Sequence, residues 1–304
     1  MPYPYVTVDV FTETAFGGNP LAVVTDARGL DADAMQRIAS EFNYSETTFI
    51  LPPEDPAHTA RVRIFTPARE VPFAGHPNVG TALVVAWAGN CLGRPVGDVV
   101  KFEEEAGLVP VAIARDRNGA ARRATLTAPQ PLAIGAEVEP SIVSACCGLA
   151  VEQVDCTAHR PVSVSVGLPF VVARLTDRAA LSAAAPDVGA FRHFAAGMPT
   201  PDLLVYVYTA GDGGRVDYHC RMFAPLDNIM EDPATGSANA ALVGLLTQLD
   251  ERSDCAVELR IAQGEDMGRP SLLLAGARKV FGKVEDIRIG GGAVEMMSGT
   301  LRAV

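Results

Sequence analysis

Residues 63–82 read RIFTPAREVPFAGHPNVGTA, and residues 221–240 repeat the pattern as RMFAPLDNIMEDPATGSANA. The matched pairs are Arg63 and Arg221, Phe65 and Phe223, Pro67 and Pro225, Pro77 and Pro233, Gly80 and Gly236, and Ala82 and Ala238. The first three pairs lie 158 residues apart and the last three lie 156 apart, so a two-residue gap reconciles the copies. A further echo lies upstream, where GNPLAVV at residues 18–24 is similar to GLPFVVA at residues 167–173. The chain is therefore expected to contain two versions of one domain.

Each copy has the same local design: a β-rich run, a proline-bearing turn and a glycine-containing segment that opens an apolar helix. The first N–H groups of a helix have no partner within the helix, and the helix dipole adds partial positive charge there. Two such helix N-termini facing each other across a pseudo-twofold axis would form a pocket for an anionic or enolate-like group. The alternative is two equivalent packing turns that carry no chemistry.

Length and composition describe a folded protein of two domains. The chain has 304 residues, more than a single hydrophobic core usually supports, and 48% of its residues are hydrophobic. A formal net charge of −11, with no Lys/Arg block, disfavours binding to nucleic acid or to an anionic membrane surface. The six cysteines show no CxxC spacing, which favours reduced thiols over a disulfide framework or a metal site.

No segment predicts export or membrane insertion. The N-terminal residues MPYPYVTVDVF lack a basic leader and run directly into an alternating strand pattern. The longest apolar run, residues 82–88, is far too short to span a bilayer. We therefore expect a cytoplasmic protein without a membrane partner.

Strand patterns dominate both halves, with only one or two long helices in each. This distribution predicts a strongly curved sheet wrapped round a central helix in each half. Gln130-Pro131 is typical of a crossing point into the second half. The expected domains are residues 1–118 together with about 290–304, and residues 119–289.

Glu46 is the first candidate for chemistry. It lies in NYSETTF, where a helix is expected to end and an apolar strand to begin. A side chain at such a junction can point away from the helix and the strand, toward a site. Partial burial among apolar and β-branched neighbours would raise its pKa toward the working range of a general acid or base. The alternative is an ordinary solvent-facing glutamate.

His76 lies in Gly75-His76-Pro77, where the proline favours the first helical turn and the glycine permits close approach of a ligand. A histidine at a helix N-terminus tends to be neutral and can donate or accept a hydrogen bond at a substrate carboxylate or carbonyl. Its alternative role is that of a capping or core histidine.

Asp232 is expected at the corresponding place in the second copy, within EDPATGSA. An aspartate before proline at a helix start is also an ordinary capping arrangement. Ser237 and the backbone N–H groups of Gly236 and Ser237 could bind a carboxylate. No histidine-based metal spacing, phosphate-binding loop or dinucleotide fingerprint is present, so neither a metal nor an organic cofactor is expected.

Five blocks together carry a family resemblance: DVFTETAFGGNPLAVV, EFNYSETTF, RIFTPAREVPFAGHPNVGTA, EDPATGSANA and QGEDMGRPS. In this order they resemble the signature blocks of the phenazine-biosynthesis PhzF-like family over nearly the whole chain. The resemblance implies an α+β fold like that of diaminopimelate epimerase. In that fold two pseudo-symmetric domains, each a barrel-like sheet around a central helix, flank the active-site cleft.

The resemblance also implies a mechanism, namely isomerisation by proton shuttling without a cofactor. Related epimerases use one cysteine from each half, and the corresponding turns of this chain contain none. By the resemblance, Glu46 transfers the proton, and His76, Asp232 and Ser237 orient the substrate and its carboxylate. Further substrate contacts are expected from Asn19, Ser45, Gly75, Pro77, Asn78, Thr235 and Gly236.

The expected function is that of an isomerase that moves a double bond in a small carboxylated metabolite. One alternative is an amino-acid racemase or epimerase of the same fold, which would use Glu46 with another base. Another is a non-catalytic protein that binds a small acid. The resemblance and the prevalence of twofold oligomers favour a homodimer. The block QGEDMGRPS is expected to seat substrate or to brace the cleft, and the alternative is a packed loop.

Overall fold

The computed structural model describes residues 2–197 and 203–302. The chain divides into two compact units: unit 1 comprises residues 1–129 and 290–304, and unit 2 comprises residues 130–289. The expected boundary at residue 118 lies too early, because it cuts the antiparallel pair of β9 (Gly107–Arg115) and β10 (Ala121–Thr127) at its turn. The division comes after β10, beside Gln130.

Unit 1 contains one curved sheet in the order β20, β1, β2, β3, β4, β8, β9, β10. Its remaining strands are β1 (Tyr3–Val10), β2 (Asn19–Val24), β3 (Glu46–Leu51), β4 (Ala60–Phe65), β5 (Glu70–Val71), β8 (Val99–Glu104) and β20 (Ala293–Leu301), with the small hairpin of β6 (Asn90–Cys91) and β7 (Arg94–Pro95). The pairs β2–β3 and β4–β8 are parallel, and the other pairs in this order are antiparallel. β5 also pairs with β4.

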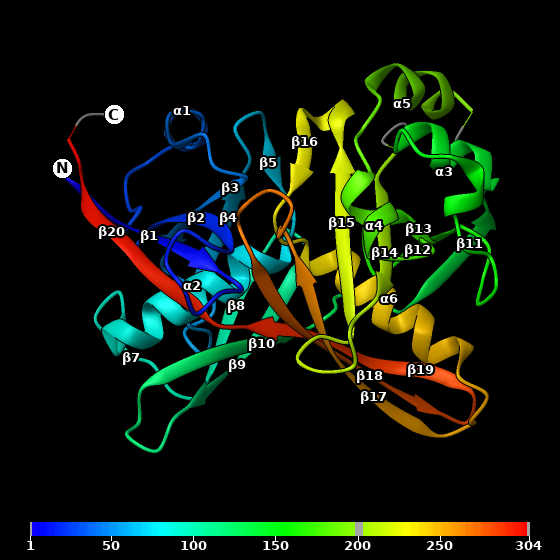
Figure 1. Ribbon diagram of the computed structural model, residues 1–304. Helices are drawn as coiled ribbons and strands as arrows, with labels where there is room; N and C mark the ends of the chain where they lie inside the picture. Colours follow the sequence, from blue (N-terminus) through cyan, green and yellow to red (C-terminus); the bar gives the residue numbers. More distant parts are fainter. Residues whose placement is uncertain (1, 198–202, 303–304) are drawn as a thin grey trace. The chain divides into compact units, whose positions relative to one another are not determined.

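Two helices of different character pack on this sheet (Figure 1). α2 (Gly75–Ala88) is apolar on all sides and buried from Gly75 to Ala86, so it lies inside the curved sheet, against β1, β2, β3, β9 and β10. At Gly80 a Cβ atom would lie 2.5 Å from Leu21 Cδ2, so only glycine allows so close an approach. α1 (Ala32–Phe42) is amphipathic and packs on β3 and β4.

Unit 2 repeats this design in the order β11, β12, β13, β14, β15, β17, β18. Again two pairs, β13–β14 and β15–β17, are parallel, and β16 pairs with β15 as β5 does with β4. α6 (Gly236–Leu249) is the central helix and packs on β12, β13, β17 and β18. The other elements are β11 (Ala133–Glu137), β12 (Val162–Ser165), β13 (Pro169–Arg174), β14 (Val205–Ala210), β15 (Tyr218–Ala224), β16 (Ile229–Asp232), β17 (Cys255–Gln263), β18 (Ser271–Val280), β19 (Lys283–Gly291), α3 (Pro140–Cys146), α4 (Arg178–Ala183), α5 (Val188–Ala195) and the short 3₁₀ turns at Val151–Gln153 and Pro225–Asp227.

The first half of the sequence repeat has the same side-chain geometry in both units. Arg63 makes a two-pronged ion pair with Glu70, with both N–O distances 2.6 Å, and its guanidinium lies 5.1 Å from the ring centre of Phe65. Arg221 pairs with Glu231 at 2.8 and 2.7 Å and lies 5.0 Å from the Phe223 ring. A planar guanidinium suits both the carboxylate and the aromatic face.

The second half of the repeat has a different register from the expected one. The two central helices begin at Gly75 and Gly236, and the paired glutamates are Glu70 and Glu231, so equivalent residues lie 161 apart. The offset of 156 was wrong, because unit 2 carries three additional residues between the strand and the turn. Ser237, and not Asp232, is therefore the equivalent of His76.

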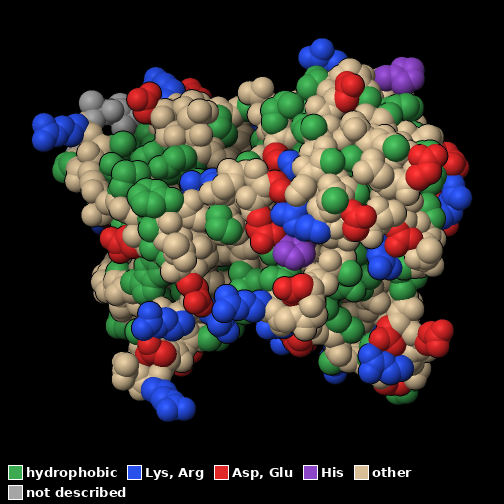
Figure 2. Space-filling view, in the orientation of Figure 1, with side chains coloured by type: hydrophobic (Ala, Val, Ile, Leu, Met, Phe, Trp, Pro, Cys, Tyr) green, Lys and Arg blue, Asp and Glu red, His purple; other side chains and the backbone are tan. Residues whose placement is uncertain are grey.

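Basic and acidic side chains are interspersed on the face of the molecule shown in Figure 2, in keeping with the absence of a Lys/Arg block in the sequence. Among residues 2–197 and 203–302, no helix has the length and apolar character needed to cross a membrane.

Candidate active site

Glu46 is the first residue of β3 and lies beside the start of a parallel strand pair. α1 ends at the left-handed Asn43 (φ 53°), and a two-residue turn then leads into β3. In the register of β2 and β3, Glu46 lies opposite Leu21, and its side chain is 18% exposed. The preceding residue, Ser45, donates its hydroxyl to Asn19 Oδ1 at 3.1 Å, which ties the turn to the start of β2.

His76, the second residue of α2, lies next to this glutamate. Its Nδ1 is 3.4 Å from Glu46 Oε2, and the side chain is only 5% exposed. The imidazole also hydrogen-bonds the backbone of Pro20. Because proline has no N–H, the partner is the carbonyl oxygen and the imidazole is the donor.

The remaining ring nitrogen fixes the tautomer of His76. Nε2 is buried and has no hydrogen-bond partner among residues 2–197 and 203–302, so the proton that binds Pro20 is on Nδ1. Burial lowers the pKa of His76 to about 3, and the Pro20 hydrogen bond offsets only part of this effect. His76 is thus a neutral imidazole whose Nε2 can accept a hydrogen bond.

The first turn of α2 adds a favourable electrostatic environment. Its N-cap, Ala74, offers no side chain to the turn's N–H groups, and the turn contains no acidic residue. Gly75 and Pro77 are buried in this turn. These N–H groups and the helix dipole can stabilise negative charge that develops beside Glu46.

Unit 2 places its candidate residues around the start of α6. Asp232 ends β16, is 6% exposed and accepts a hydrogen bond from the Thr235 hydroxyl at 2.5 Å. Gly236 and Ser237 are the first two residues of α6, and the Ser237 side chain is partly exposed. The structure thus brings Asp232, Thr235, Gly236 and Ser237 together within one turn.

Gln263 holds this turn in place, a role that the sequence did not reveal. Its side-chain amide donates to the Asp232 carbonyl at 2.8 Å and to Thr235 Oγ1 at 3.0 Å. Its oxygen accepts from the Thr235 N–H at 3.1 Å and from Asn239 Nδ2 at 2.8 Å. The only sequence signal is its position at the start of QGEDMGRPS, which lies 31 residues after Asp232.

The rest of QGEDMGRPS braces the same turn. Ser271 Oγ donates to the Pro233 carbonyl at 2.8 Å. Gly264 has φ +75°, and a Cβ atom there would lie 2.6 Å from the same carbonyl oxygen. Within unit 2 this block is a packed loop that supports the start of α6.

The candidate residues of unit 1 lie at the start of α2 and at the adjoining ends of β2 and β3. Asn78 follows two residues after His76, and its Nδ2 donates to the N-cap carbonyl of Ala74 at 3.0 Å. Asn239 makes the same bond to Thr235 in unit 2, at 2.8 Å. This shared contact confirms the offset of 161 at the level of single hydrogen bonds.

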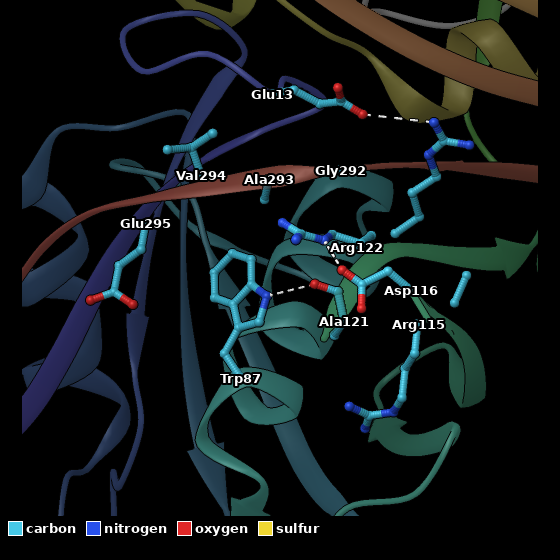
Figure 3. A pocket seen from close by; sticks show the side chains of 12 residues that line it. Glu13, Trp87, Arg115, Asp116, Ala121, Arg122, Gly292, Ala293, Val294 and Glu295 are labelled. Carbon is cyan, nitrogen blue, oxygen red and sulfur yellow. Dashed lines mark hydrogen bonds and ion pairs between the residues drawn. The ribbon is translucent and has the colours of Figure 1, made fainter. Parts of the chain in front are cut away.

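A separate hollow of about 820 Å³ in unit 1 contains none of the candidate residues (Figure 3). Trp87 lies in it and donates its indole N–H to the Ala121 carbonyl at 3.0 Å. The arginines around it already pair with acidic side chains, as Arg122 does with Asp116 at 2.8 Å. The Glu46–His76 corner, with a buried and unpartnered imidazole nitrogen, is better suited to chemistry. No group of three or more potential metal ligands lies together in the described part of the chain.

Comparison with known proteins gives consistent matches along the whole chain. The model of a family described as phenazine biosynthesis-like protein, PhzC-PhzF, matches residues 8–299. An uncharacterized isomerase of Mesorhizobium japonicum is 39% identical over 304 residues, covering 98% of each chain. A trans-2,3-dihydro-3-hydroxyanthranilate isomerase of Pseudomonas chlororaphis is 35% identical over 302 residues, with the same coverage.

Solved structures agree with the fold. A phenazine biosynthesis protein of the PhzF family from Bacillus anthracis matches with a TM-score of 0.88 at 24% identity, covering all of both chains. A hydroxyproline epimerase from Agrobacterium vitis matches with a TM-score of 0.61 at 14% identity, covering 99% of this chain and 92% of that one. These likenesses confirm the α+β, epimerase-like fold that the sequence resemblance implied.

Proposed function

The chain belongs to the PhzC-PhzF family of phenazine biosynthesis-like proteins, and from that premise we propose that it moves a double bond in a small carboxylated metabolite by proton transfer through Glu46. Its relatives are named as isomerases, and this chain is an isomerase too. The step changes no oxidation state, so it calls for no redox cofactor.

The observation that carries the proposal is the pairing of Glu46 with a neutral, buried imidazole at 3.4 Å. A carboxylate beside a neutral imidazole, in a corner of low dielectric, is well placed to act as a base toward an acidic C–H bond. A charged histidine there would hold Glu46 in an ion pair and weaken it as a base.

In the proposed step, the Glu46 carboxylate takes a proton from a carbon next to an electron-withdrawing group. The C–H electron pair becomes part of a new double bond, the old double bond shifts, and negative charge develops at its far carbon. The carboxylic acid proton of Glu46 exchanges with solvent, and Glu46 then donates a proton to that carbon, so the substrate keeps its elemental formula and Glu46 becomes a carboxylate again. Backbone N–H groups in the first turn of α2 stabilise the charge that develops.

The other candidate residues orient the substrate in this proposal. His76 Nε2 accepts a hydrogen bond from a substrate O–H or N–H, and Asn19, Ser45, Gly75, Pro77 and Asn78 shape that side of the site. At the start of α6, Asp232 and Ser237 are proposed to orient the substrate and its carboxylate, and Thr235 and Gly236 to contact the substrate. The N–H groups of a helix's first turn have no partner within the helix, so they are suited to binding an anion.

The test is deuterium uptake in D₂O, followed by mass spectrometry. The probes are trans-2,3-dihydro-3-hydroxyanthranilate, the compound named for the Pseudomonas relative, and a pool of other small carboxylated metabolites. We expect mass gain with the wild type and a loss of at least about 100-fold with Glu46→Gln, because removing a general base typically costs 10² to 10⁴ in rate. Glu41→Gln, on the exposed face of α1, is the matched control and retains exchange.

Each outcome has a distinct meaning. Exchange that persists unchanged in Glu46→Gln would rule out this residue as the base. Exchange with loss of optical activity and without a change in absorbance would indicate a racemase or epimerase. Saturable binding without exchange for any probe would indicate a non-catalytic small-acid-binding protein.

We also propose a homodimer located in the cytoplasm. Twofold assemblies are the commonest oligomers, and light scattering would distinguish the chain mass of 31.9 kDa from twice that value. Fractionation of the source cells would test the location.

A further inference from the structure

Gln263 of unit 2 has a positional equivalent in unit 1, and that residue is Glu104. In the parallel pair β15–β17, Cys220 lies opposite Gln263. In the parallel pair β4–β8, Arg61 lies opposite Glu103, which places Val62 beside Glu104. Val62 directly precedes Arg63 just as Cys220 directly precedes the equivalent Arg221, so Glu104 and Gln263 occupy the same place.

The helix that each of these residues faces is equivalent as well. Asn78 and Asn239 are the fourth residues of α2 and α6, and each donates to its N-cap carbonyl. Asn239 also donates to Gln263 Oε1 at 2.8 Å, and the side chain of Asn78 interacts with the carboxyl of Glu104. An equivalent asparagine therefore lies beside this position in both units, with an amide there in unit 2 and a carboxyl in unit 1.

The chemical difference lies in the hydrogen-bonding capacity of the two groups. An amide has donors and an acceptor, whereas an ionised carboxylate only accepts; a protonated carboxyl has one donor and one acceptor and so resembles the amide. Both carboxyl oxygens of Glu104 are buried and, within the described residues, make no hydrogen bond of ordinary geometry. Asn78 Oδ1 is likewise a buried acceptor without a partner in that part of the chain.

The surroundings of Glu104 favour the protonated form. Burial raises the pKa of Glu104 to about 8, and the interaction with Asn78 offsets part of this rise. Neighbouring elements carry Arg61 and Arg63 on β4, Glu70 on β5, His76 on α2, Arg115 on β9 and Glu105 in the adjoining turn, and none of these groups is among the causes of the shift. No cation is therefore holding this carboxyl ionised.

We propose that Glu104, as a neutral carboxylic acid, is a positioning residue of the Glu46–His76 site, bracing the first turn of α2 through Asn78 as Gln263 braces that of α6. The inference rests on the proposed function of this site. Ionisation of Glu104 removes the donor and leaves an unpaired charge beside Asn78, two residues from His76. The site then loses the alignment that the reaction needs.

The experiment compares pH profiles of kcat and KM for the wild type, Glu104→Gln, Glu104→Leu and the neighbouring exposed control Glu105→Gln. Above about pH 8 the wild type and the control are expected to lose kcat about tenfold per pH unit, since one ionisation governs the decline. Glu104→Gln places at this position the amide that Gln263 provides in unit 2. This variant is expected to show no alkaline decline and to have a kcat near that of the wild type at pH 7. Glu104→Leu is expected to have a low kcat at all pH values with a smaller change in KM.

A second measurement does not depend on turnover. In ¹⁵N-histidine-labelled protein, the His76 Nε2 resonance is expected to shift with a midpoint near pH 8 in the wild type and in Glu105→Gln, but not in Glu104→Gln. A midpoint that persists in Glu104→Gln, or a wild-type resonance that does not move, overturns the proposal even if Glu104→Leu fails to fold. Absence of exchange with every probe, together with the expected resonance shift, contradicts the proposed function and leaves the brace standing.

Discussion

The imidazole of His76 is subject to two opposing influences. The Pro20 carbonyl favours a protonated ring, and burial disfavours it; burial is the larger effect, and the pKa is about 3. The sequence motif GHP indicates a helix start with a histidine in its first turn. It does not reveal how deeply the ring is buried, because that depends on β2 and β3, which contact α2 from distant parts of the sequence.

The burial of His76 predicts a pH dependence of stability. The unfolded chain binds a proton at His76 below about pH 6.5, and the folded protein does so only near pH 3, so the unfolded state carries more protons in between. The free energy of unfolding therefore decreases as the pH falls through this range, by about 1.4 kcal/mol per pH unit. Urea unfolding at pH 7, 6 and 5 is expected to show a shallower decline for His76→Gln than for the wild type. His193→Gln, on the exposed face of α5, should retain the wild-type slope, and equal slopes in all three proteins would contradict the prediction.

At the scale of elements, the start of α6 depends on a side chain from β17. The Gln263 side chain donates two hydrogen bonds and accepts two, and these bonds hold Asp232, Thr235 and Asn239 in place. Since Gln263 is fully buried, water cannot replace its hydrogen bonds when the side chain is removed, and the polar groups that it binds are left unpaired. The turn is thus part of the hydrogen-bond network of the sheet.

Gln263→Leu is expected to lower the free energy of unfolding by about 2–4 kcal/mol, because it leaves several buried polar groups unpaired. It should also lower kcat at least tenfold by releasing Asp232 and Thr235. Chemical denaturation and steady-state kinetics measure the two effects. Gln248→Leu removes only an exposed contact to the Gly282 carbonyl and serves as the control; a Gln263→Leu protein as stable as this control would count against the brace.

Local signals in the sequence predicted some elements well. Asp31 caps α1 by accepting from the Ala34 N–H at 2.8 Å, and the left-handed Asn43 ends the helix in NYSETTF, where the sequence indicated a helix end. Both central helices were expected because their sequences are apolar on every side. Contacts between parallel strands could not be predicted, because partners such as Cys220 and Gln263 lie far apart in sequence.

The register of the repeat shows a second limit of the sequence. Pro77 and Pro233 match by identity, yet Pro77 is the third residue of α2 and Pro233 precedes α6. Because unit 2 has three additional residues before its helix, prolines that match in sequence do not occupy equivalent positions in the structure. The helix starts Gly75 and Gly236 give the correct offset, and the pairs Glu70 with Glu231 and Asn78 with Asn239 agree with it because their contacts are the same.

At the scale of the whole molecule, unit 2 is an insertion within unit 1. The chain leaves unit 1 after Pro129 and returns at Gly290. β20 then pairs with β1 along its length, so that Tyr3 lies opposite Leu301 (Figure 1). The N-terminal strand is therefore covered on one edge by the last strand.

Deleting residues 293–302 is expected to destabilise unit 1 selectively, because β1 loses its antiparallel partner and exposes an unpaired edge. Hydrogen exchange followed by mass spectrometry should show faster exchange in residues 3–24, while peptides of α6 and β17 keep their wild-type protection. Equal loss of protection in both units would show that they unfold as one.

The insertion also has a consequence for biosynthesis on the ribosome. Residues 130–289 emerge as one continuous stretch, whereas the first 129 residues must wait for the segment after Gly290 before β1 gains its outer neighbour. Domains generally fold as units once all of their chain has emerged. The unit that carries Glu46 therefore begins to be translated before unit 2 but is completed after it, and the outer edge of β1 stays open until β20 has emerged.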